Sequence, residues 1–251
     1  IDGSGGRKIG YLEFATFIST AEPGFEEIFA EFNAQNVTEV IVDLRYNGGG
    51  LVRTAELLGD YLGGRIATSR VFSSTEFNAD RAPENNSQRF FSLFGNSLNL
   101  TDLVVIATRG TASASELVTN GLDPHTRVTI VGTNTFGKPV GQIGLELPGG
   151  CDILLRPTSF KTVNADSFGE FFDGLPVDCP ATDDLDIPVG DDSDPNMVAA
   201  LGYLETGSCP LTAGRDGVSK TAGGTEALSA GFDARRPELT GPPWREFANA
   251  Y

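Results

Sequence analysis

The chain has 251 residues, enough for one large domain with a substantial core. Its 34 acidic and 18 basic residues give a formal charge of −16, which disfavours non-specific binding to nucleic acid or to anionic membranes. No apolar run reaches the roughly 20 residues of a membrane span. With a single histidine and no Cys-x-x-Cys pair, we expect neither a structural metal site nor a metal-dependent hydrolase.

The three cysteines, Cys151, Cys179 and Cys209, leave the redox compartment open. An exported protein could form one disulfide and keep one thiol, whereas a reducing cytoplasm would keep all three as thiols. The chain starts with Ile1 and shows no signal peptide, so it reads as a mature fragment.

The first third of the chain alternates strand and helix patterns. Aromatic and β-branched residues predict a strand within 8–18, and apolar spacings of three and four predict a helix over 24–35. Residues 37–44 are almost continuously apolar, as in a strand buried in a parallel sheet. Helical spacing returns over 51–62, so the intervening glycines, 48–50, form a strand-to-helix junction.

The middle of the chain continues this alternation. We expect a strand near 65–72 and an irregular excursion with a short helix within 75–99. A strand at 103–108, a helix at 113–122 and a strand at 127–131 follow. Strands are also expected within 143–161, around the Pro148-Gly-Gly150 turn. The pattern as a whole predicts an α/β fold.

The end of the chain differs in composition. After Thr162 it becomes loop-like and acidic, which favours a solvated surface over a calcium site because the spacing does not fit an EF-hand loop. A last helix is expected near 196–204. Residues 210–251 are rich in Gly, Ala, Thr and Pro. We predict a core over 1–209 and a flexible or loosely docked extension over 210–251.

Ser113 and Lys138, 25 positions apart, form a candidate nucleophile and base. A serine hydroxyl needs an adjacent base, which can be a lysine whose pKa is lowered by desolvation. The lone histidine, His125, is more simply a capping or surface residue. Ser115 competes as nucleophile, but it would lie within the first helical turn rather than at its start.

Each of these residues also has a structural interpretation. Ser113-Ala-Ser-Glu116 fits a helix capping box, which on that motif alone is the simpler role. Lys138 could be a solvent-facing loop lysine and Gln142 a turn residue. The glycines at 48–50 could form a tight turn or present an amide to a carbonyl oxygen. Asp43 and Arg45 are interpreted as a structural ion pair.

Three segments together resemble the core of the S41 family of C-terminal processing, or tail-specific, serine proteases. They are Val42-Asp-Leu-Arg-Tyr-Asn-Gly-Gly-Gly50, Thr111-Ala-Ser-Ala-Ser-Glu116 and Thr135-Phe-Gly-Lys-Pro-Val-Gly-Gln142. Their order and spacing across about a hundred residues carry the resemblance, which extends more loosely over about 8–205. It implies a ClpP/crotonase-like fold of repeated ββα units.

The resemblance also implies roles. Ser113 would be the nucleophile, Lys138 the general base and Gln142 the residue that orients the lysine. The amides of Gly50 and Ala114 would form the oxyanion hole. The implied activity is a serine endopeptidase that processes or degrades proteins from or near their C-termini, without a cofactor and with protein or peptide substrates.

The chain departs from the family pattern in two respects. No PDZ domain is recognised within it, so such a domain is expected to have been removed or to lie upstream. Pro139 follows the lysine where many relatives have glycine, which stiffens the loop. The family analogy implies an exported protein, periplasmic or associated with the envelope.

Three alternatives stay open at this point. The same fold resembles retinoid-binding repeats, so the chain could be a catalytically silent binding module for an apolar ligand. It could be a crotonase-like acyl-CoA enzyme, although its acidity suits CoA phosphates poorly. It could also be a fragment whose missing segments complete the site.

Overall fold

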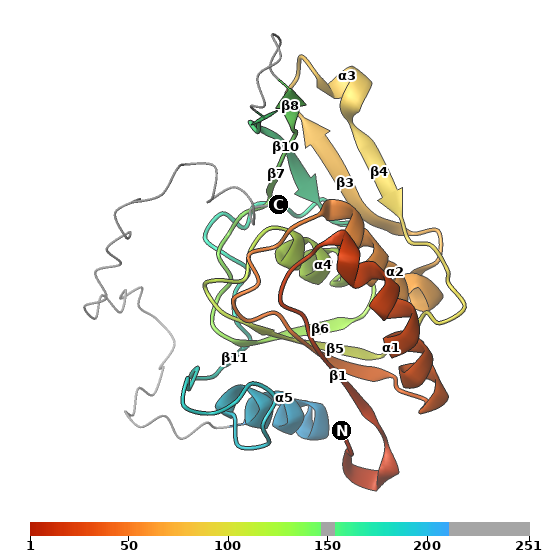
Figure 1. Cartoon of the computed structure of the whole chain (residues 1–251), viewed down its shortest axis with the longest axis vertical. Coiled ribbons are helices and arrows are strands. Elements are labelled where there is room, and N and C mark those ends of the chain that lie inside the picture. Colours follow the sequence, from red (N-terminus) through yellow and green to blue (C-terminus); the bar gives the residue numbers. More distant parts are fainter. Residues whose placement is uncertain (147–153, 211–251) are drawn as a thin grey trace, which may run out of the picture.

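The computed structural model describes residues 1–146 and 154–210. At its centre lies a five-stranded, all-parallel sheet (Figure 1). Apart from edge strand β11, its strands are mostly buried, which explains their β-branched and aliphatic sequences. In spatial order the strands are β1 (Ile9–Glu13), β2 (Glu39–Asp43), β5 (Asp102–Ala107), β6 (Arg127–Gly132) and β11 (Cys179–Pro180).

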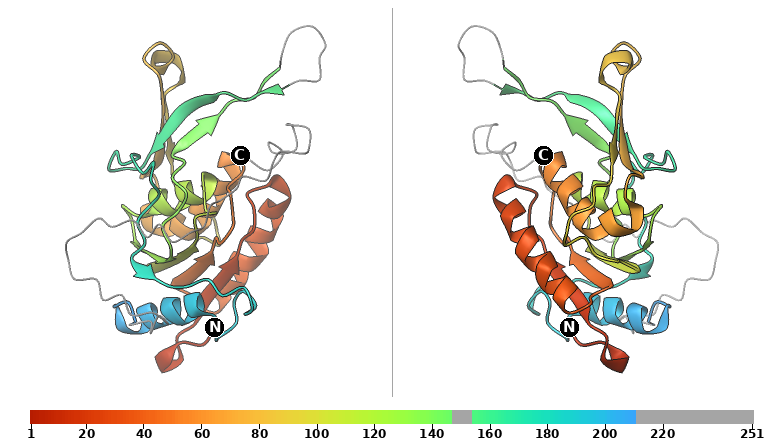
Figure 2. Two further views of the ribbon diagram at one scale, coloured as in Figure 1. Left: turned by 90° about the vertical axis from the view of Figure 1, so that its left-hand side faces the viewer. Right: turned by 90° about the vertical axis from the view of Figure 1, so that its right-hand side faces the viewer.

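Helices cover both faces of this sheet (Figure 2). On one face lie α1 (Glu22–Ala34), α2 (Val52–Ala67) and α4 (Ala114–Leu122), which share the larger apolar core with the strands. On the other face α5 (Pro195–Thr206) buries Met197, Ala199 and Ala200 in a smaller core. The sheet is therefore the middle of three layers.

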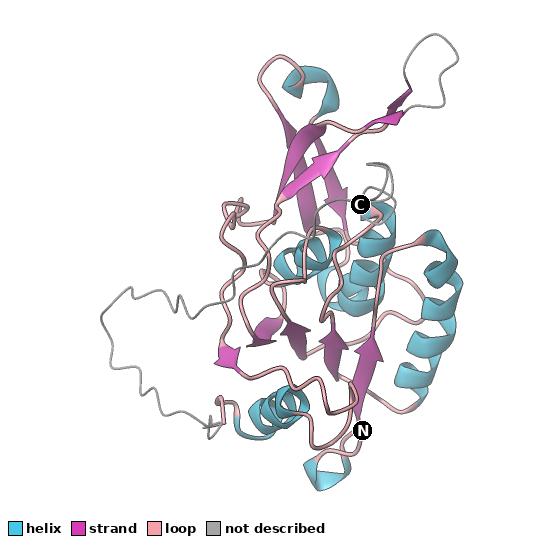
Figure 3. Cartoon of the chain, turned by 60° about the vertical axis from the view of Figure 1, so that its left-hand side comes forward, coloured by secondary structure: helices cyan, strands magenta, loops and turns pink. Residues whose placement is uncertain are grey.

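A second, antiparallel sheet stands beyond the helices (Figure 3). Its order is β4 (Ser87–Phe90), β3 (Val71–Phe77), β10 (Thr158–Val163) and β7 (Val140–Gln142). The short pair β8 (Leu145–Glu146) and β9 (Leu154–Leu155) extends it. The remaining short elements are η1 (Ser4–Gly6), η2 (Ser19–Ala21) and α3 (Ala82–Asn85).

The predicted α/β fold class is confirmed, with corrections in the middle of the chain. The strand expected near 65–72 is wrong, because α2 continues to Ala67 and β3 begins at Val71. The glycines late in α2 permit close packing: a Cβ on Gly63 would lie 2.7 Å from Leu122, and one on Gly64 would lie 2.3 Å from the carbonyl oxygen of Ser92. The excursion at 75–99 holds the expected short helix, α3, but also the end of β3 and all of β4.

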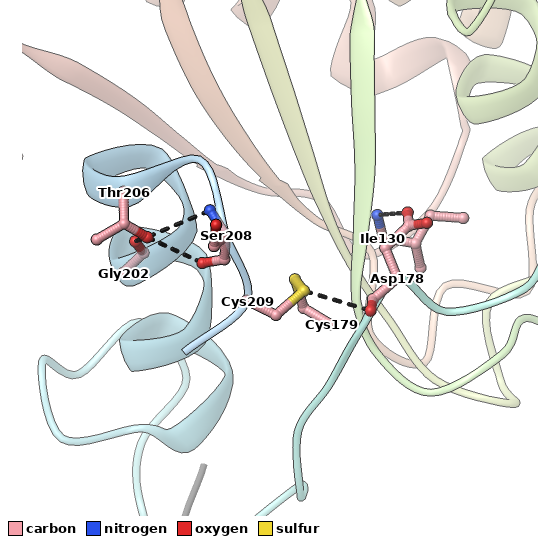
Figure 4. The surroundings of a disulfide bond; sticks show 7 residues. All are labelled: Ile130, Asp178, Cys179, Gly202, Thr206, Ser208 and Cys209. Atoms are coloured by element: carbon pink, nitrogen blue, oxygen red, sulfur yellow. Dashed lines mark hydrogen bonds between the residues drawn. A yellow bond between two sulfur atoms is a disulfide. The ribbon is translucent and has the colours of Figure 1, made fainter. Parts of the chain in front are cut away.

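One disulfide joins Cys179 in β11 to Cys209 beyond α5 (Figure 4). It fastens the end of α5 to the edge of the parallel sheet. The helix ends at Gly207, and Thr206 Oγ1 donates to the carbonyl oxygen of Gly202 at 2.8 Å. The sequence left open whether any of the cysteines form a disulfide; the structure joins Cys179 to Cys209, while Cys151 lies outside the described residues.

Some carboxylates of the acidic segment have partners in the fold. Asp178 accepts a hydrogen bond from the amide of Ile130 at 2.8 Å, and Asp183 and Asp194 bind Arg45. The acidic stretch is therefore not solely a solvated surface. No helix in the described ranges is long and apolar enough to cross a membrane. The predicted turn at 148–150 and the extension from residue 211 onward lie outside those ranges.

Candidate active site

Ser113 lies in the turn that connects β5 to α4, immediately before the first helical residue. Its φ of 56° and ψ of −111° are rare for a residue with a side chain. A sharp turn of this kind between a strand and a helix exposes the side chain at the carboxyl end of the strand. The side chain is half-buried and lines a cavity.

The competing hydroxyl, Ser115, is fully buried, and its Oγ donates to the carbonyl oxygen of Asn47 at 2.9 Å. That hydroxyl is committed to a contact between two backbone segments. Only Ser113 of the two lines the cavity, so the geometry favours it as the reactive residue.

Lys138 lies between β6 and β7 and is half-buried. Its side chain lines the same cavity as Ser113 and forms no ion pair within the described part of the chain. Burial lowers the pKa of Lys138 from its ordinary value, and the negative charge of Glu116 opposes this effect. Lys138 is therefore a partly desolvated lysine and not a fully exposed loop residue.

The cavity that these residues share has a volume of about 290 Å³. Gln142 faces it from β7 with a buried Oε1 that accepts no hydrogen bond from the described residues. Ser113 and Lys138 make no direct hydrogen bond in this structure, and catalytic hydrogen bonds commonly tighten only when substrate is bound. The lining residues are Gly50, Leu51, Val52, Ser113, Lys138, Val140, Gly141, Gln142 and Phe160.

Two backbone amides beside the cavity are candidates for an oxyanion hole. Ala114 is the first residue of α4, where helical N–H groups have no acceptor within the helix. Gly50 has a φ of 144°, which the strand-to-helix junction requires, and a Cβ there would lie 2.1 Å from the carbonyl oxygen of Phe17. In the described ranges neither amide donates a hydrogen bond.

Glu116 is the residue whose importance the sequence understated. Its fully buried carboxylate accepts four hydrogen bonds. Two come from the backbone amides of Ser113 and Lys138, both at 2.8 Å. The others come from the Thr135 hydroxyl at 2.6 Å and the Gly137 amide at 2.7 Å. The capping-box pattern predicted the contact between Glu116 and Ser113. The hydrogen bonds from Gly137 and Lys138 to Glu116 depend on tertiary structure.

The other titratable residues considered, His125, Asp43 and Arg45, make contacts within the fold and do not line the cavity. His125 is half-buried rather than a surface residue: its Nε2 lies 2.8 Å from the carbonyl oxygen of Val71, and its ring packs edge-on against Phe91. It lies outside the cavity of Ser113. The predicted ion pair of Asp43 and Arg45 is present and buried, and Arg45 also binds Asp194 at 2.6 Å. Within the described residues no group of three His, Cys, Asp or Glu side chains could hold a metal ion.

The comparisons with known proteins agree with the α/β architecture. Residues 8–170 match the model of Peptidase family S41, and the chain belongs to this family.

Among curated relatives, the chloroplastic C-terminal processing peptidase of Tetradesmus obliquus is 32% identical over 161 residues, which is 64% of this chain and 32% of that protein. The carboxyl-terminal-processing protease of Picosynechococcus is 27% identical over 64% of this chain and 37% of the relative. The chain thus spans about a third of the length of these relatives.

Solved structures show the same architecture. A Bacteroides fragilis protein assigned to the S41 proteases superposes with a TM-score of 0.74 and 25% identity, covering 81% of this chain and 56% of the other. The photosystem II D1 C-terminal processing protease superposes with a TM-score of 0.58 and 27% identity, covering 72% of this chain and 44% of the other.

Proposed function

We propose that this chain is the catalytic core of a serine endopeptidase that uses Ser113 and Lys138 as a dyad. The observation that carries the proposal is their placement on one cavity, with Ser113 on a sharp strand-to-helix turn and Lys138 half-buried. Membership of Peptidase family S41 supports a peptidase.

In the proposed reaction, the Lys138 amine takes the proton of the Ser113 hydroxyl as Oγ attacks a peptide carbonyl carbon. The electron pair of the carbonyl moves to oxygen, and the amides of Gly50 and Ala114 stabilise the resulting oxyanion. Collapse of this intermediate breaks the C–N bond, and Lys138 returns the proton to the leaving amine. Water then attacks the acyl carbon while Lys138 takes a proton from it, the bond between the acyl carbon and Ser113 Oγ breaks, and Lys138 returns the proton to Ser113 Oγ.

Lys138 can act as this base only when its amine is neutral. Burial moves its pKa in the required direction. Gln142 shares the cavity, and its Oε1, which has no hydrogen-bond partner among the described residues, is placed to accept a hydrogen bond from the lysine amine and orient it. The reaction should therefore accelerate as pH rises through the pKa of Lys138.

The proposed substrates are proteins or peptides cut at or near their C-termini, since both curated relatives described above and one of the solved structures are named C-terminal processing peptidases or proteases. We also propose that the protein is exported to the periplasm or envelope. The Cys179–Cys209 disulfide supports this, because such bonds persist mainly in oxidising compartments.

The test is hydrolysis of casein by the wild type, Ser113→Ala and Lys138→Ala, with folding checked by circular dichroism. Lys161→Ala is a matched control, because Lys161 is paired with Glu76 and Glu170 rather than directed into the cavity. Both cavity variants should lose at least about 10³-fold in kcat/KM, while the control stays active.

Activity that survives in folded Ser113→Ala would exclude the assigned nucleophile. A folded wild type that cleaves nothing would instead favour the alternative of a catalytically silent binding module. Direct binding of an apolar ligand to the cavity would then support that alternative.

A further inference from the structure

Asn47 lies between β2 and the glycine junction, and it is completely buried. Its side-chain Oδ1 accepts a hydrogen bond from the amide of Gly49 at 2.9 Å, and its Nδ2 donates to the carbonyl oxygen of Phe14 at 2.7 Å. Its own carbonyl oxygen accepts from the amide of Ala112 at 3.0 Å and from Ser115 Oγ at 2.9 Å. One residue therefore contacts both the glycine junction and the turn that carries Ser113.

These two backbone segments pack directly on one another. A Cβ on Gly49 would lie 2.8 Å from both the carbonyl oxygen of Ala112 and the amide nitrogen of Ala114. Gly49 has a φ of 101°, so this close approach uses a conformation that side-chain-bearing residues rarely adopt. The amide of Ala114 is part of this contact, and the amide of Gly50 belongs to the next residue after Gly49; neither donates a hydrogen bond within the described residues. Their relative position depends on whatever fixes the two segments together.

We propose that Asn47 is a positioning residue that sets the geometry of the oxyanion hole, an inference that rests on the proposed peptidase function. It acts on Gly50 through the amide of Gly49, and on Ala114 through Ala112 and Ser115. Asparagine suits this place because the side chain must accept from one backbone group and donate to another. An aspartate has the same shape but supplies only acceptors, so one of its carboxylate oxygens would be placed against the carbonyl oxygen of Phe14 and repel it.

This role predicts a specific kinetic signature. An oxyanion hole stabilises charge that develops in the transition state, so its misplacement lowers kcat while substrate affinity changes little. A purely structural role would reduce the amount of folded enzyme but would leave the properties of each folded molecule unchanged. Relative affinity for a transition-state-like ligand distinguishes the two roles.

The experiment uses two probes built on the sequence that precedes a cleaved bond in casein: a peptide aldehyde and the corresponding peptide alcohol. Ser113 Oγ adds to the aldehyde carbon, the carbonyl electron pair moves to oxygen, and Lys138 receives the hydroxyl proton. The alcohol binds without forming an oxyanion. The ratio of the two inhibition constants, aldehyde over alcohol, therefore reports on formation of the covalent adduct and its oxyanion rather than on ground-state binding.

Asn47→Asp should lower kcat by about 10²-fold, as removal of one oxyanion donor does, with KM within about threefold of the wild type. Affinity for the aldehyde should fall in parallel, while affinity for the alcohol stays constant. Asn164→Asp is the matched control. Asn164 is also buried, accepts from the amides of Asp166 and Phe168, and donates to Asn120, away from the cavity.

A folded Asn47→Asp enzyme with an unchanged aldehyde-to-alcohol ratio overturns the proposal. If that variant does not fold, Ser115→Ala decides the question, because it removes one hydrogen bond to the Asn47 carbonyl. It should lower kcat about fivefold and raise the aldehyde-to-alcohol ratio of inhibition constants about fivefold, and an unchanged ratio again overturns the proposal. A wild type that neither cleaves peptides nor prefers the aldehyde overturns the peptidase proposal itself, and this inference with it.

Discussion

Replacing Glu116 with glutamine is the most informative single change at the site. The carboxylate accepts four hydrogen bonds, two at each oxygen. Glutamine keeps one carbonyl oxygen and puts an NH₂ group in the place of the other. If the NH₂ group faces the amides of Ser113 and Lys138, both lose their acceptor and two donors are brought together.

The structure sets the expected magnitude of this change. A buried donor left without an acceptor costs about 1–3 kcal/mol, so two cost about 2–6 kcal/mol. Removing a buried charge offsets part of this cost, because burying a carboxylate is itself unfavourable. We therefore expect Glu116→Gln to lower the free energy of unfolding by about 2–4 kcal/mol.

The same variant should change the pH dependence of activity. The proposed base is the neutral amine of Lys138, so kcat/KM rises with pH through its pKa. The charge of Glu116 raises that pKa, and a neutral glutamine removes this effect. The rise in kcat/KM should therefore move to lower pH, even though misplacement of the two segments lowers the maximum rate.

Urea unfolding followed by circular dichroism and peptide hydrolysis between pH 6 and 10 measure both effects. Glu27→Gln, at an exposed position on α1, is the control for loss of one negative charge. An unfolding free energy within about 0.5 kcal/mol of the wild type would refute the hydrogen-bond argument. A shift of the activity profile to higher pH would refute the electrostatic one.

Three further outcomes are expected. Replacing Cys179 and Cys209 with serine should lower the free energy of unfolding by about 3–4 kcal/mol for a bond across 30 residues, and a reductant should have no further effect on the variant. Burial lowers the pKa of His125 below its ordinary 6.5, so stability should fall as pH drops below 6.5, and His125→Gln should remove that part of the dependence in urea titrations. Arg45→Met should cost about 3–5 kcal/mol at neutral pH, because it leaves the buried carboxylates of Asp43 and Asp194 without their cation; equal stability in thermal unfolding would contradict this.

Local patterns in the sequence were sufficient for much of the fold. Near-continuous apolar runs predicted β2, β5 and β6, because strands buried on both faces need such runs. The prediction ended the helix at residue 62, whereas α2 continues through Gly63 and Gly64 to Ala67. An isolated segment does not show that these glycines allow Leu122 and Ser92 to approach the helix. The short strands β4 and β11 escaped prediction because their pairing partners lie elsewhere in the chain.

The candidate site divides in the same way. The sequence by itself determined which hydroxyl and amine groups were available, and that Ser113 would lie at the start of a helix, because these depend on residue type and on local spacing. Tertiary structure decided that the Ser115 hydroxyl donates to the carbonyl oxygen of Asn47. It also decided that Glu116 accepts hydrogen bonds from the amides of both Ser113 and Lys138, and that Cys179 pairs with Cys209. Apart from the local hydrogen bond between Ser113 and Glu116, each of those contacts joins residues more than 20 positions apart, and only the packing of the sheet and helices brings such residues together.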